Sequence, residues 1–242
     1  LYEEGEYDIF AASRRTVEAM ARKIEHLPQG TRVLDIGAGY GGAGRYLANA
    51  HGFHVTCLNL SKVQNDRNRE MNREQGLADR VEVVDGNFED LPFDNQTFDV
   101  VWSQDAILHS GQRFRVFQEA DRVLKPGGMV VMTDPMQARD VPLEELRPVL
   151  DRIHLETMGS IRDYEDFARQ LGWEVREVDR RTEHLVRHYS AVLRNLEERE
   201  GDLQETVSPA YIANMKRGLR HWITAGQANR LAWGILTFAK PA

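Results

Sequence analysis

The stretch VLDIGAGYGGAGRYLA, residues 33–48, constrains the fold of this chain more than any other segment. An apolar run containing Asp35 leads into Gly37, Gly39 and Gly42, which match the spacing G-x-G-x-x-G between a strand and a helix. Glycine permits the positive φ of such a turn and lets a ligand approach the backbone closely. The motif fits NAD, FAD, the adenosyl group of S-adenosylmethionine, or a tight turn without a ligand. The rest of the chain must decide among these.

Apolar runs alternate with helical patterns along most of the chain. We expect strands over 32–36, 53–60, 81–85, 97–104, 129–134, 173–179 and 231–239. We expect helices over 10–26, from the glycine turn to 50, and over 61–75, 113–124, 143–155, 161–173, 182–199 and 208–225. This order predicts an α/β fold with a doubly wound, seven-stranded, mostly parallel sheet. Because no linker divides the chain, we expect residues 1–242 to form one domain, with helical cap elements at about 136–158 and 182–225 over the carboxyl ends of the strands.

Composition narrows the class of partner. The net charge of −7 without a long basic run argues against nucleic acid and favours a small-molecule partner. No apolar stretch approaches the ~20 residues of a membrane span, so we expect no membrane partner. The single cysteine, Cys57, excludes an intrachain disulfide and indicates a reducing, cytoplasmic location, with Cys57 itself in the core. His184 and His188 lack an evident third ligand, so we expect no metal.

Residues at two further strand ends bear on the choice of nucleotide. A dinucleotide fold usually carries an acid for the ribose hydroxyls at the end of its second strand, where this chain has Asn59. The Asn59 amide suits a diol, although an asparagine there could equally end a strand or cap a helix. After the third strand, GNFEDLPF offers the Asn87 amide and the Phe88 backbone N–H to an adenine.

Taken together, DIGAGYGG, Asn59, NFEDLPF and VLKPGG resemble the motifs of class I S-adenosylmethionine-dependent methyltransferases, in the same order. The likeness extends over nearly the whole chain to the sarcosine/dimethylglycine N-methyltransferases, which make glycine betaine. It is carried by LNLSKVQNDRN, SQDAILHSG, RVLKPGGMVVMTDPMQ and the tail HWITAG followed by LAWGILTFAKP. The resemblance implies a Rossmann-like methyltransferase fold, an amine acceptor and S-adenosylmethionine as methyl donor. Members of that family also carry a Trp-Gly-Gly segment that would precede Leu1.

The resemblance also implies which residues hold the donor. The turn at Gly37 would lie beside its methionine part and ribose, and Gln104 would contact its amino-acid end. Asn59 and Leu60 would flank the ribose and adenine, near Gln64. The full set of expected donor residues is Asp35, Gly37, Gly39, Asn59, Leu60, Gln64, Asn87, Phe88 and Gln104.

The acceptor residues follow from the chemistry of a methylated ammonium. Aromatic faces suit such a cation, and Tyr189 and Trp222 are candidates, each as readily a core residue. Arg187 is the candidate for a substrate carboxylate, although a solvent-facing role competes. His109, in AILHSG, is the candidate that orients or deprotonates the amine. Asp105 could favour a cationic group electrostatically, and Trp233 is expected in the core of a central strand.

Four functional hypotheses remain at this point. The first is an N-methyltransferase that converts dimethylglycine, and sarcosine as a further substrate, into glycine betaine as an osmolyte. The second is a methyltransferase of the same fold for phosphoethanolamine, a sterol or another lipid. The third is an adenosyl-nucleotide binding module without catalysis. The fourth, an oxidoreductase, fits Asn59 and NFEDLPF poorly.

Overall fold

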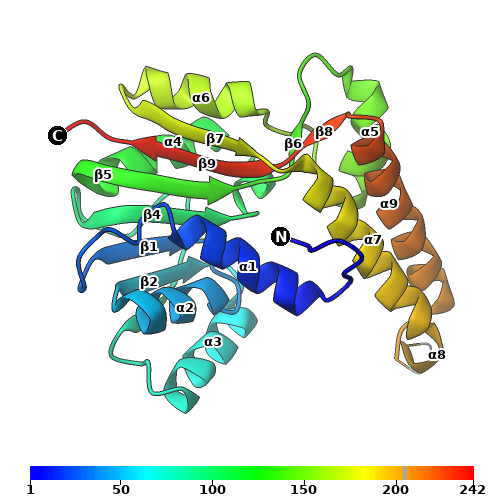
Figure 1. Ribbon diagram of the computed structural model, residues 1–242, viewed down its shortest axis with the longest axis horizontal. Coiled ribbons are helices and arrows are strands. Elements are labelled where there is room, and N and C mark those ends of the chain that lie inside the picture. The colour runs from blue at the N-terminus through cyan, green and yellow to red at the C-terminus, as the bar shows by residue number, and fades with distance from the viewer. Residues whose placement is uncertain (204–205) are drawn as a thin grey trace. The chain divides into compact units, whose positions relative to one another are not determined.

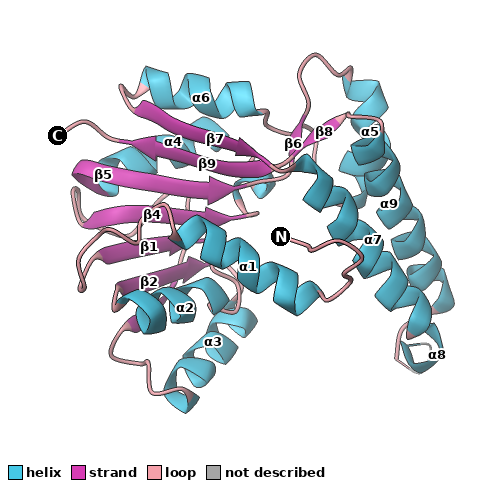
Figure 2. Cartoon of the chain, in the orientation of Figure 1, coloured by secondary structure: helices cyan, strands magenta, loops and turns pink. Residues whose placement is uncertain are grey.

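The computed structural model describes residues 1–203 and 206–242. Its principal feature is a seven-stranded sheet in the order β3-β2-β1-β4-β5-β9-β7 (Figure 1). Strands β3, β2, β1, β4 and β5 pair in parallel, and β9 pairs with β5 in the antiparallel direction. Helices flank both faces of the sheet, with α2 on the near face and α4 on the far face in Figure 2. The predicted fold class is therefore confirmed.

The elements follow the expected alternation. The strands are β1 Arg32–Ile36, β2 His54–Asn59, β3 Val81–Asp85, β4 Phe98–Gln104, β5 Leu124–Thr133, β6 Met136–Gln137, β7 Glu174–Arg180, β8 Leu231–Ala232 and β9 Gly234–Ala239. The helices are α1 Ile9–Ala21, α2 Gly42–His51, α3 Lys62–Glu74, α4 Arg113–Val123, α5 Leu143–Arg152, α6 Ile161–Gln170, α7 Thr182–Glu198, α8 Glu200–Leu203 and α9 Pro209–Gln227, with a short 3₁₀ turn η1 at Ile107–His109.

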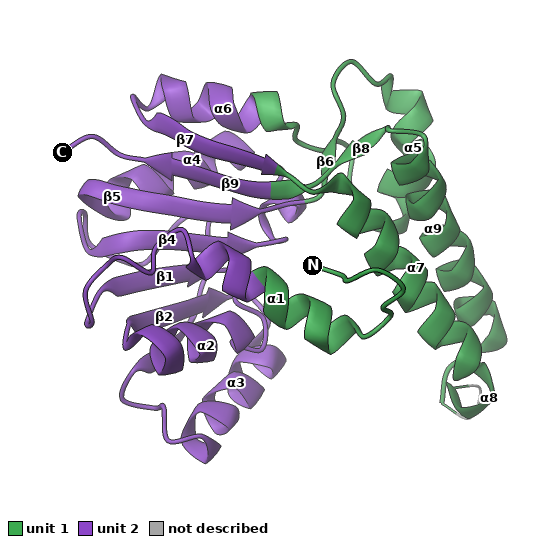
Figure 3. Cartoon of the chain, in the orientation of Figure 1, with its two compact units in different colours: residues 1–16, 135–162, 180–234 green, residues 17–134, 163–179, 235–242 purple. Residues whose placement is uncertain are grey.

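The chain forms two compact units, coloured separately in Figure 3. Unit 1 comprises residues 1–16, 135–162 and 180–234, and unit 2 comprises residues 17–134, 163–179 and 235–242. Neither unit is continuous in the sequence, because the chain passes from one to the other and back more than once. The expected cap segments, 136–158 and 182–225, both belong to unit 1. A single domain over residues 1–242 stays a prediction.

The core of unit 2 lies along the central strands. Val33, Leu34, Val100 and Val131 are fully buried there, as their β-branched and apolar side chains favour. Cys57 is also fully buried, and burial raises the pKa of its thiol, so its expected role as a small core residue is confirmed.

Three details of the sequence-based prediction are wrong. Residues 231–239 form two strands rather than one, because Trp233 leaves the sheet: its carbonyl accepts from the Arg181 N–H (2.8 Å) and its N–H donates to Thr182 Oγ1 (3.2 Å). Trp233 is buried between β8 and β9, not on a central strand. The strand expected to begin at residue 129 begins instead at Leu124, and KPGG forms an irregularity within β5, where the register with β4 jumps from Leu124 to Met129.

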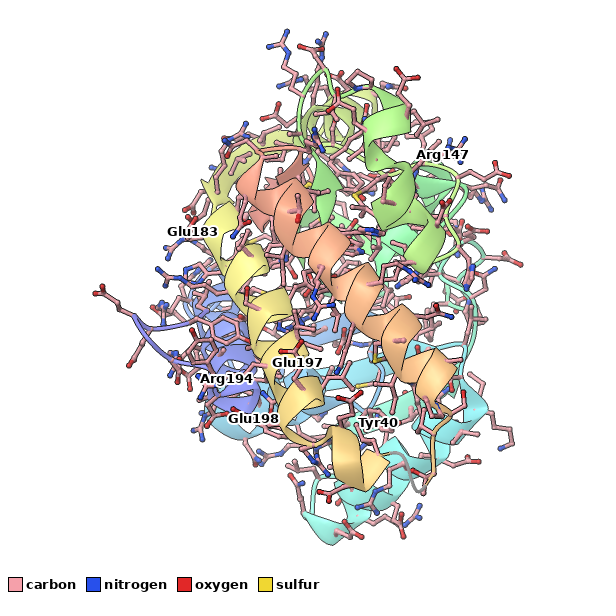
Figure 4. The ribbon with its side chains drawn as sticks, turned by 90° about the vertical axis from the view of Figure 1, so that its right-hand side faces the viewer. Tyr40, Arg147, Glu183, Arg194, Glu197 and Glu198 are labelled. Atoms are coloured by element: carbon pink, nitrogen blue, oxygen red, sulfur yellow. The ribbon has the colours of Figure 1, made fainter. Side chains whose placement is uncertain are left out.

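Unit 1 is built from helices α5, α7 and α9 and the two-stranded β6–β8 sheet, of which β6 was not predicted. The outer side of α7 is charged, with Arg194 paired to Glu198 at 2.7 Å, and Glu197 paired to Arg220 of α9 at 2.7 Å (Figure 4). Leu196, Ile212 and Leu219 form a buried apolar cluster of this unit. Among the helices of the described residues, none combines the length and apolarity needed to cross a membrane.

Candidate functional site

The glycine turn between β1 and α2 is held against neighbouring strands. Gly37, Gly39 and Gly41 all have positive φ, at 77°, 54° and 72°. The N–H groups of Gly37 and Ala38 donate to the Leu58 carbonyl of β2 at 2.8 and 3.1 Å. A Cβ on Gly37 would come within 2.4 Å of Ala106 Cβ, whereas a Cβ on Gly39 would meet nothing within 4 Å. Gly39, unlike Gly37, is therefore an open position of the turn, where a ligand can approach the backbone.

Four loops follow the carboxyl ends of β1, β2, β3 and β4, which lie side by side in the sheet. Ligands of open α/β sheets bind at this edge. The loops are tied together: Gly86 N–H donates to the Asn59 carbonyl at 3.2 Å, and the Ser110 hydroxyl donates to Glu89 Oε1. All nine expected donor residues and His109 belong to unit 2 and lie on these strands and loops or on the adjoining α3.

Asp35 differs from the rest of this group because it lies inside β1, with only 2% of its surface exposed. No hydrogen bond reaches its carboxylate from the described residues, and burial raises its pKa to about 7. A buried carboxylate without a donor is costly in the ionised form. Asp35 is therefore suited to a cationic group supplied from outside the chain.

The end of β2 presents two amides that contact each other. Asn59 Nδ2 donates to Gln64 Oε1 at 2.9 Å, and both side chains are half-buried. Ser61 caps α3, because its hydroxyl accepts from the Gln64 N–H. Leu60 is 69% exposed, so it is available to pack against a ligand ring.

Beneath the glycine turn lies a buried polar cluster that sequence reasoning missed. Asn65, Asn68 and Asn72 form the inner face of α3, and Arg45 donates to Asn68 Oδ1 (2.8 Å) and Asn72 Oδ1 (3.0 Å). Burial lowers the pKa of Arg45. The Asn68 side chain occupies the place that a Cβ on Gly41 would take. The cluster thus fixes the turn from below, and its only signal in the sequence is asparagine at helical spacing.

The loop after β3 contains Asn87 and Phe88, the two residues predicted to contact an adenine. Asn87 Oδ1 accepts from the Glu89 N–H at 2.9 Å, which leaves the amide N–H groups of Asn87 without a partner among the described residues. The Phe88 N–H also lacks a partner there, and its ring is half-buried. The Asn87 amide and the Phe88 backbone N–H, which are adjacent in the sequence, are therefore both free to donate hydrogen bonds to a ligand.

The end of β4 carries a strained turn. Asp105 has φ of 52°, which is unfavourable for a residue with a Cβ, and its N–H donates to the Thr133 carbonyl at 2.9 Å. Such strain is often found at functional sites. The turn places Ala106 against Gly37 and leads to His109 in η1. His109 is exposed, yet neighbouring atoms desolvate its ring enough to lower its pKa, which favours the neutral imidazole.

Asp134 and Tyr164 hold this turn in place and were also missed. Asp134, fully buried just after β5, accepts from the Leu108 N–H at 3.1 Å and from the Tyr164 hydroxyl. Burial raises the pKa of Asp134 to about 8, and it raises the pKa of Tyr164 as well. Tyr164 stacks on Phe117 with centroids 5.6 Å apart. An acid that ends an apolar strand is the signal that could have identified Asp134.

The aromatic candidates Tyr189 and Trp222 contact each other in unit 1. Their ring centroids are 4.6 Å apart, and Trp222 is fully buried while Tyr189 is half-buried. The indole Nε1–H of Trp222 has no hydrogen-bond partner in the described residues. Arg187 is exposed and donates to the Tyr2 carbonyl at 3.1 Å, so its guanidinium is partly engaged by backbone.

Metal ligation finds no support in the described ranges, which hold no group of three or more His, Cys, Asp or Glu side chains able to bind an ion. His184 Nδ1 accepts from the Tyr2 N–H at 2.9 Å, and His188 Nδ1 lies 3.0 Å from the Tyr2 hydroxyl. Both histidines are half-buried, and desolvation lowers the pKa of both imidazoles.

Comparison with known proteins identifies close relatives. Residues 34–132 match the family described as "Methyltransferase domain". The chain is 55% identical to a sarcosine/dimethylglycine N-methyltransferase from Aphanothece halophytica, over all of the chain and 87% of that protein. It is 51% identical to an enzyme of the same name from Halorhodospira halochloris, over 99% of the chain and 86% of that protein. A solved structure from Galdieria sulphuraria, provisionally identified as a sarcosine dimethylglycine methyltransferase, has a TM-score of 0.95 and 42% identity, over all of the chain and 90% of that structure.

Proposed function

Since the chain belongs to the family of sarcosine/dimethylglycine N-methyltransferases, we propose that it transfers a methyl group from S-adenosylmethionine to dimethylglycine. The product is glycine betaine, and sarcosine is a further acceptor within the same proposal. The observation that carries it is the 55% identity over the full chain to the Aphanothece halophytica enzyme. The open glycine position and the unpaired Asp35 support the choice of a cationic donor.

The reaction is an in-line displacement. The nitrogen lone pair of dimethylglycine forms a bond to the methyl carbon as the carbon–sulfur bond breaks, and the positive charge passes from sulfur to nitrogen. The amine must lose its proton before it can attack, and water can accept that proton. The donor is already activated, so orientation of the reactants is the protein's main task, worth on the order of 7–11 kcal/mol in favourable cases.

We assign roles to the residues as follows. Asp35 and Gln104 bind the cationic amino-acid end of S-adenosylmethionine. The turn at Gly37 and Gly39 lies beside its methionine part and ribose. Asn59, Leu60 and Gln64 bind the ribose and adenine edge, while Asn87 and Phe88 donate to the adenine ring. His109, whose neutral form is favoured, orients the amine or accepts its proton. Asp105 contributes negative charge near it, and Tyr189 and Trp222 supply aromatic surface for the methylated ammonium.

Product analysis tests the proposal directly. Purified protein with S-adenosylmethionine should convert dimethylglycine to betaine, and it should leave phosphoethanolamine and sterols unmethylated. Turnover of either of those acceptors in preference to dimethylglycine would favour the second hypothesis. Saturable donor binding without any turnover would indicate a binding module, and spectral change with NAD would indicate an oxidoreductase.

Partner and location complete the proposal. A small-molecule amine, with no nucleic acid or membrane partner, agrees with the net charge of −7. A cytoplasmic location agrees with the single buried cysteine.

A further inference from the structure

Arg152, the last residue of α5, lies at the meeting point of three helices of unit 1. Its guanidinium carbon is 5.6 Å from the centroid of the Tyr189 ring on α7. Its stem lies against Gly218 of α9: a Cβ at position 218 would be 2.4 Å from Arg152 Cδ and 2.8 Å from Cγ. Glycine is unfavourable inside a helix, so its presence in the middle of α9 is explained by the room that Arg152 needs.

The charge of Arg152 is not neutralised by the surrounding residues. Arg152 is half-buried, and within residues 1–203 and 206–242 no carboxylate forms an ion pair with it. The positive charge of Arg152 adds to the effect of burial in lowering the pKa of His188. The Tyr189 ring provides an aromatic face for the guanidinium, whose N–H donors have no hydrogen-bond partner among the described residues.

A second unsatisfied donor lies beside the same tyrosine. The Trp222 ring contacts Tyr189 at 4.6 Å, and its fully buried Nε1–H has no partner among the described residues. A buried donor without an acceptor is destabilising. The Nε1–H of Trp102 also lacks a partner in the described residues, but of these two indoles only that of Trp222 contacts Tyr189, beside the free donors of Arg152. Tyr189 thus contacts both a guanidinium and an indole whose donors are available.

We propose that Arg152, rather than Arg187, binds the carboxylate of the N-methylated amino acid acceptor. The guanidinium fork matches a carboxylate in two parallel hydrogen bonds. Arg187 is less suited, because it is exposed and donates to the Tyr2 carbonyl. This inference rests on the proposed function and specifies how that site selects an amino acid over other amines.

The test compares four single variants by steady-state kinetics at saturating donor. Arg152→Met should raise the KM for dimethylglycine by about tenfold or more, the usual loss for a charge-assisted pair. Arg152→Lys should give a smaller rise, because it keeps the charge without the fork. Arg147→Met is the matched control, because Arg147 lies exposed on the same helix (Figure 4). Arg187→Met and Arg147→Met should behave like the wild type, and calorimetry should give the same donor affinity for all four.

A second route displaces Arg152 without removing it. Gly218→Ala should push the Arg152 stem aside and raise the KM for dimethylglycine, while α9 gains a better helix former. N,N-dimethylethanolamine, which lacks the carboxylate, should be used equally by wild type, Arg152→Met and Gly218→Ala. If Arg152→Met is unfolded by circular dichroism, Arg152→Lys and Gly218→Ala decide the question.

The outcomes separate the two proposals. A wild-type protein that binds donor but never methylates dimethylglycine refutes the proposed function, and the inference with it. Wild-type turnover with Arg152→Met equal to Arg147→Met refutes the inference alone. Equal loss of both acceptors in Arg152→Met, or a raised KM in Arg187→Met alone, also overturns it.

Discussion

Gly37 and Gly39 lie two residues apart in the same turn yet face different surroundings. Gly39 has φ of 54° and open space at its Cβ position, so Gly39→Val should block the donor and add only backbone strain, on the order of 1–2 kcal/mol. Gly30→Val is the matched control, with φ of 82° and equally open space before β1. Both should lose similar stability by thermal melting, but only Gly39→Val should lose donor binding by calorimetry. Equal affinity of both variants for S-adenosylmethionine would contradict the proposal that the donor lies against Gly39.

Gly37→Val is expected to lose donor binding for a different reason. Its side chain would collide with Ala106 and force the turns after β1 and β4 apart. Donor affinity should disappear together with a fall in melting temperature larger than that of Gly39→Val. A Gly37→Val protein with wild-type donor affinity would show that this packing is unimportant for the site.

Asp35 gives a pH-dependent prediction. Its pKa of about 7 in the folded protein lies above the unfolded value, so the protein loses stability as pH rises from about 4 to 7 and the carboxyl ionises. Asp35→Asn should therefore be more stable than wild type at pH 8, by on the order of a few kcal/mol. Wild-type donor affinity should rise between pH 6 and 8, since the ionised carboxylate attracts the cation, and Asp35→Asn should lose that rise. Chemical unfolding and calorimetry at three pH values measure both effects, and a parallel rise in the variant would rule out this role.

At the scale of elements, β5 and α6 are joined by the Asp134–Tyr164 hydrogen bond. Tyr164→Phe removes the hydroxyl that donates a hydrogen bond to the fully buried Asp134 carboxyl, and should lower the free energy of unfolding by about 1–3 kcal/mol. The η1 turn keeps its bond from Leu108, so donor affinity should change little while kcat falls through misplacement of His109. Tyr211→Phe, at a 57% exposed position of α9, is the control and should change neither quantity. If Tyr164→Phe and Tyr211→Phe have the same kcat and the same stability, Tyr164 does not position the η1 turn.

Helix α9 contains Trp222, whose indole N–H has no hydrogen-bond partner among the described residues. Trp222→Phe should raise the KM for dimethylglycine more than it weakens donor binding, because it removes the N–H while keeping most of the ring. Trp102→Phe in β4 is a matched comparison, since Trp102 is equally buried and its Nε1–H also lacks a partner in the described part of the chain. The Trp102 variant should leave the acceptor KM unchanged. If the two variants behave alike toward dimethylglycine, Trp222 belongs to the core alone.

The elements also show how far sequence reasoning reaches. The sheet was predictable because buried parallel strands are continuous apolar runs, and glycine and asparagine mark the ends where loops begin. The break in the strand at Trp233 was not predictable, because the hydrogen bonds that hold Trp233 out of the sheet are made with Arg181 and Thr182, far away in the sequence. Asn68 was missed because a buried amide looks like a surface residue until its helix is packed. Arg152 was missed because only its contacts with Tyr189 and Gly218 distinguish it from other arginines.

At the scale of the whole molecule, the methyl donor and the acceptor product should slow hydrogen exchange in different units. S-adenosylmethionine alone is expected to slow hydrogen exchange in unit 2, at the loops following β1 to β4, because bound ligand suppresses local opening. Betaine added to the complex with the demethylated donor should slow exchange in α5, α7 and α9. Mass spectrometry of peptides from each condition measures this. If betaine does not slow hydrogen exchange in α5, α7 and α9, the assignment of Arg152, Tyr189 and Trp222 to the acceptor site is wrong.

The repeated passage of the chain between its two units restricts how such an enzyme can acquire a new acceptor. Unit 1 is assembled from three separate stretches, so transplanting it from a relative requires three simultaneous exchanges with five new junctions. Recombination at a single crossover would mix parental pieces within one unit. Changes in acceptor preference should therefore accumulate through point substitutions at positions such as 152 and 218, and comparison of natural variants should find them there before any wholesale replacement of helices.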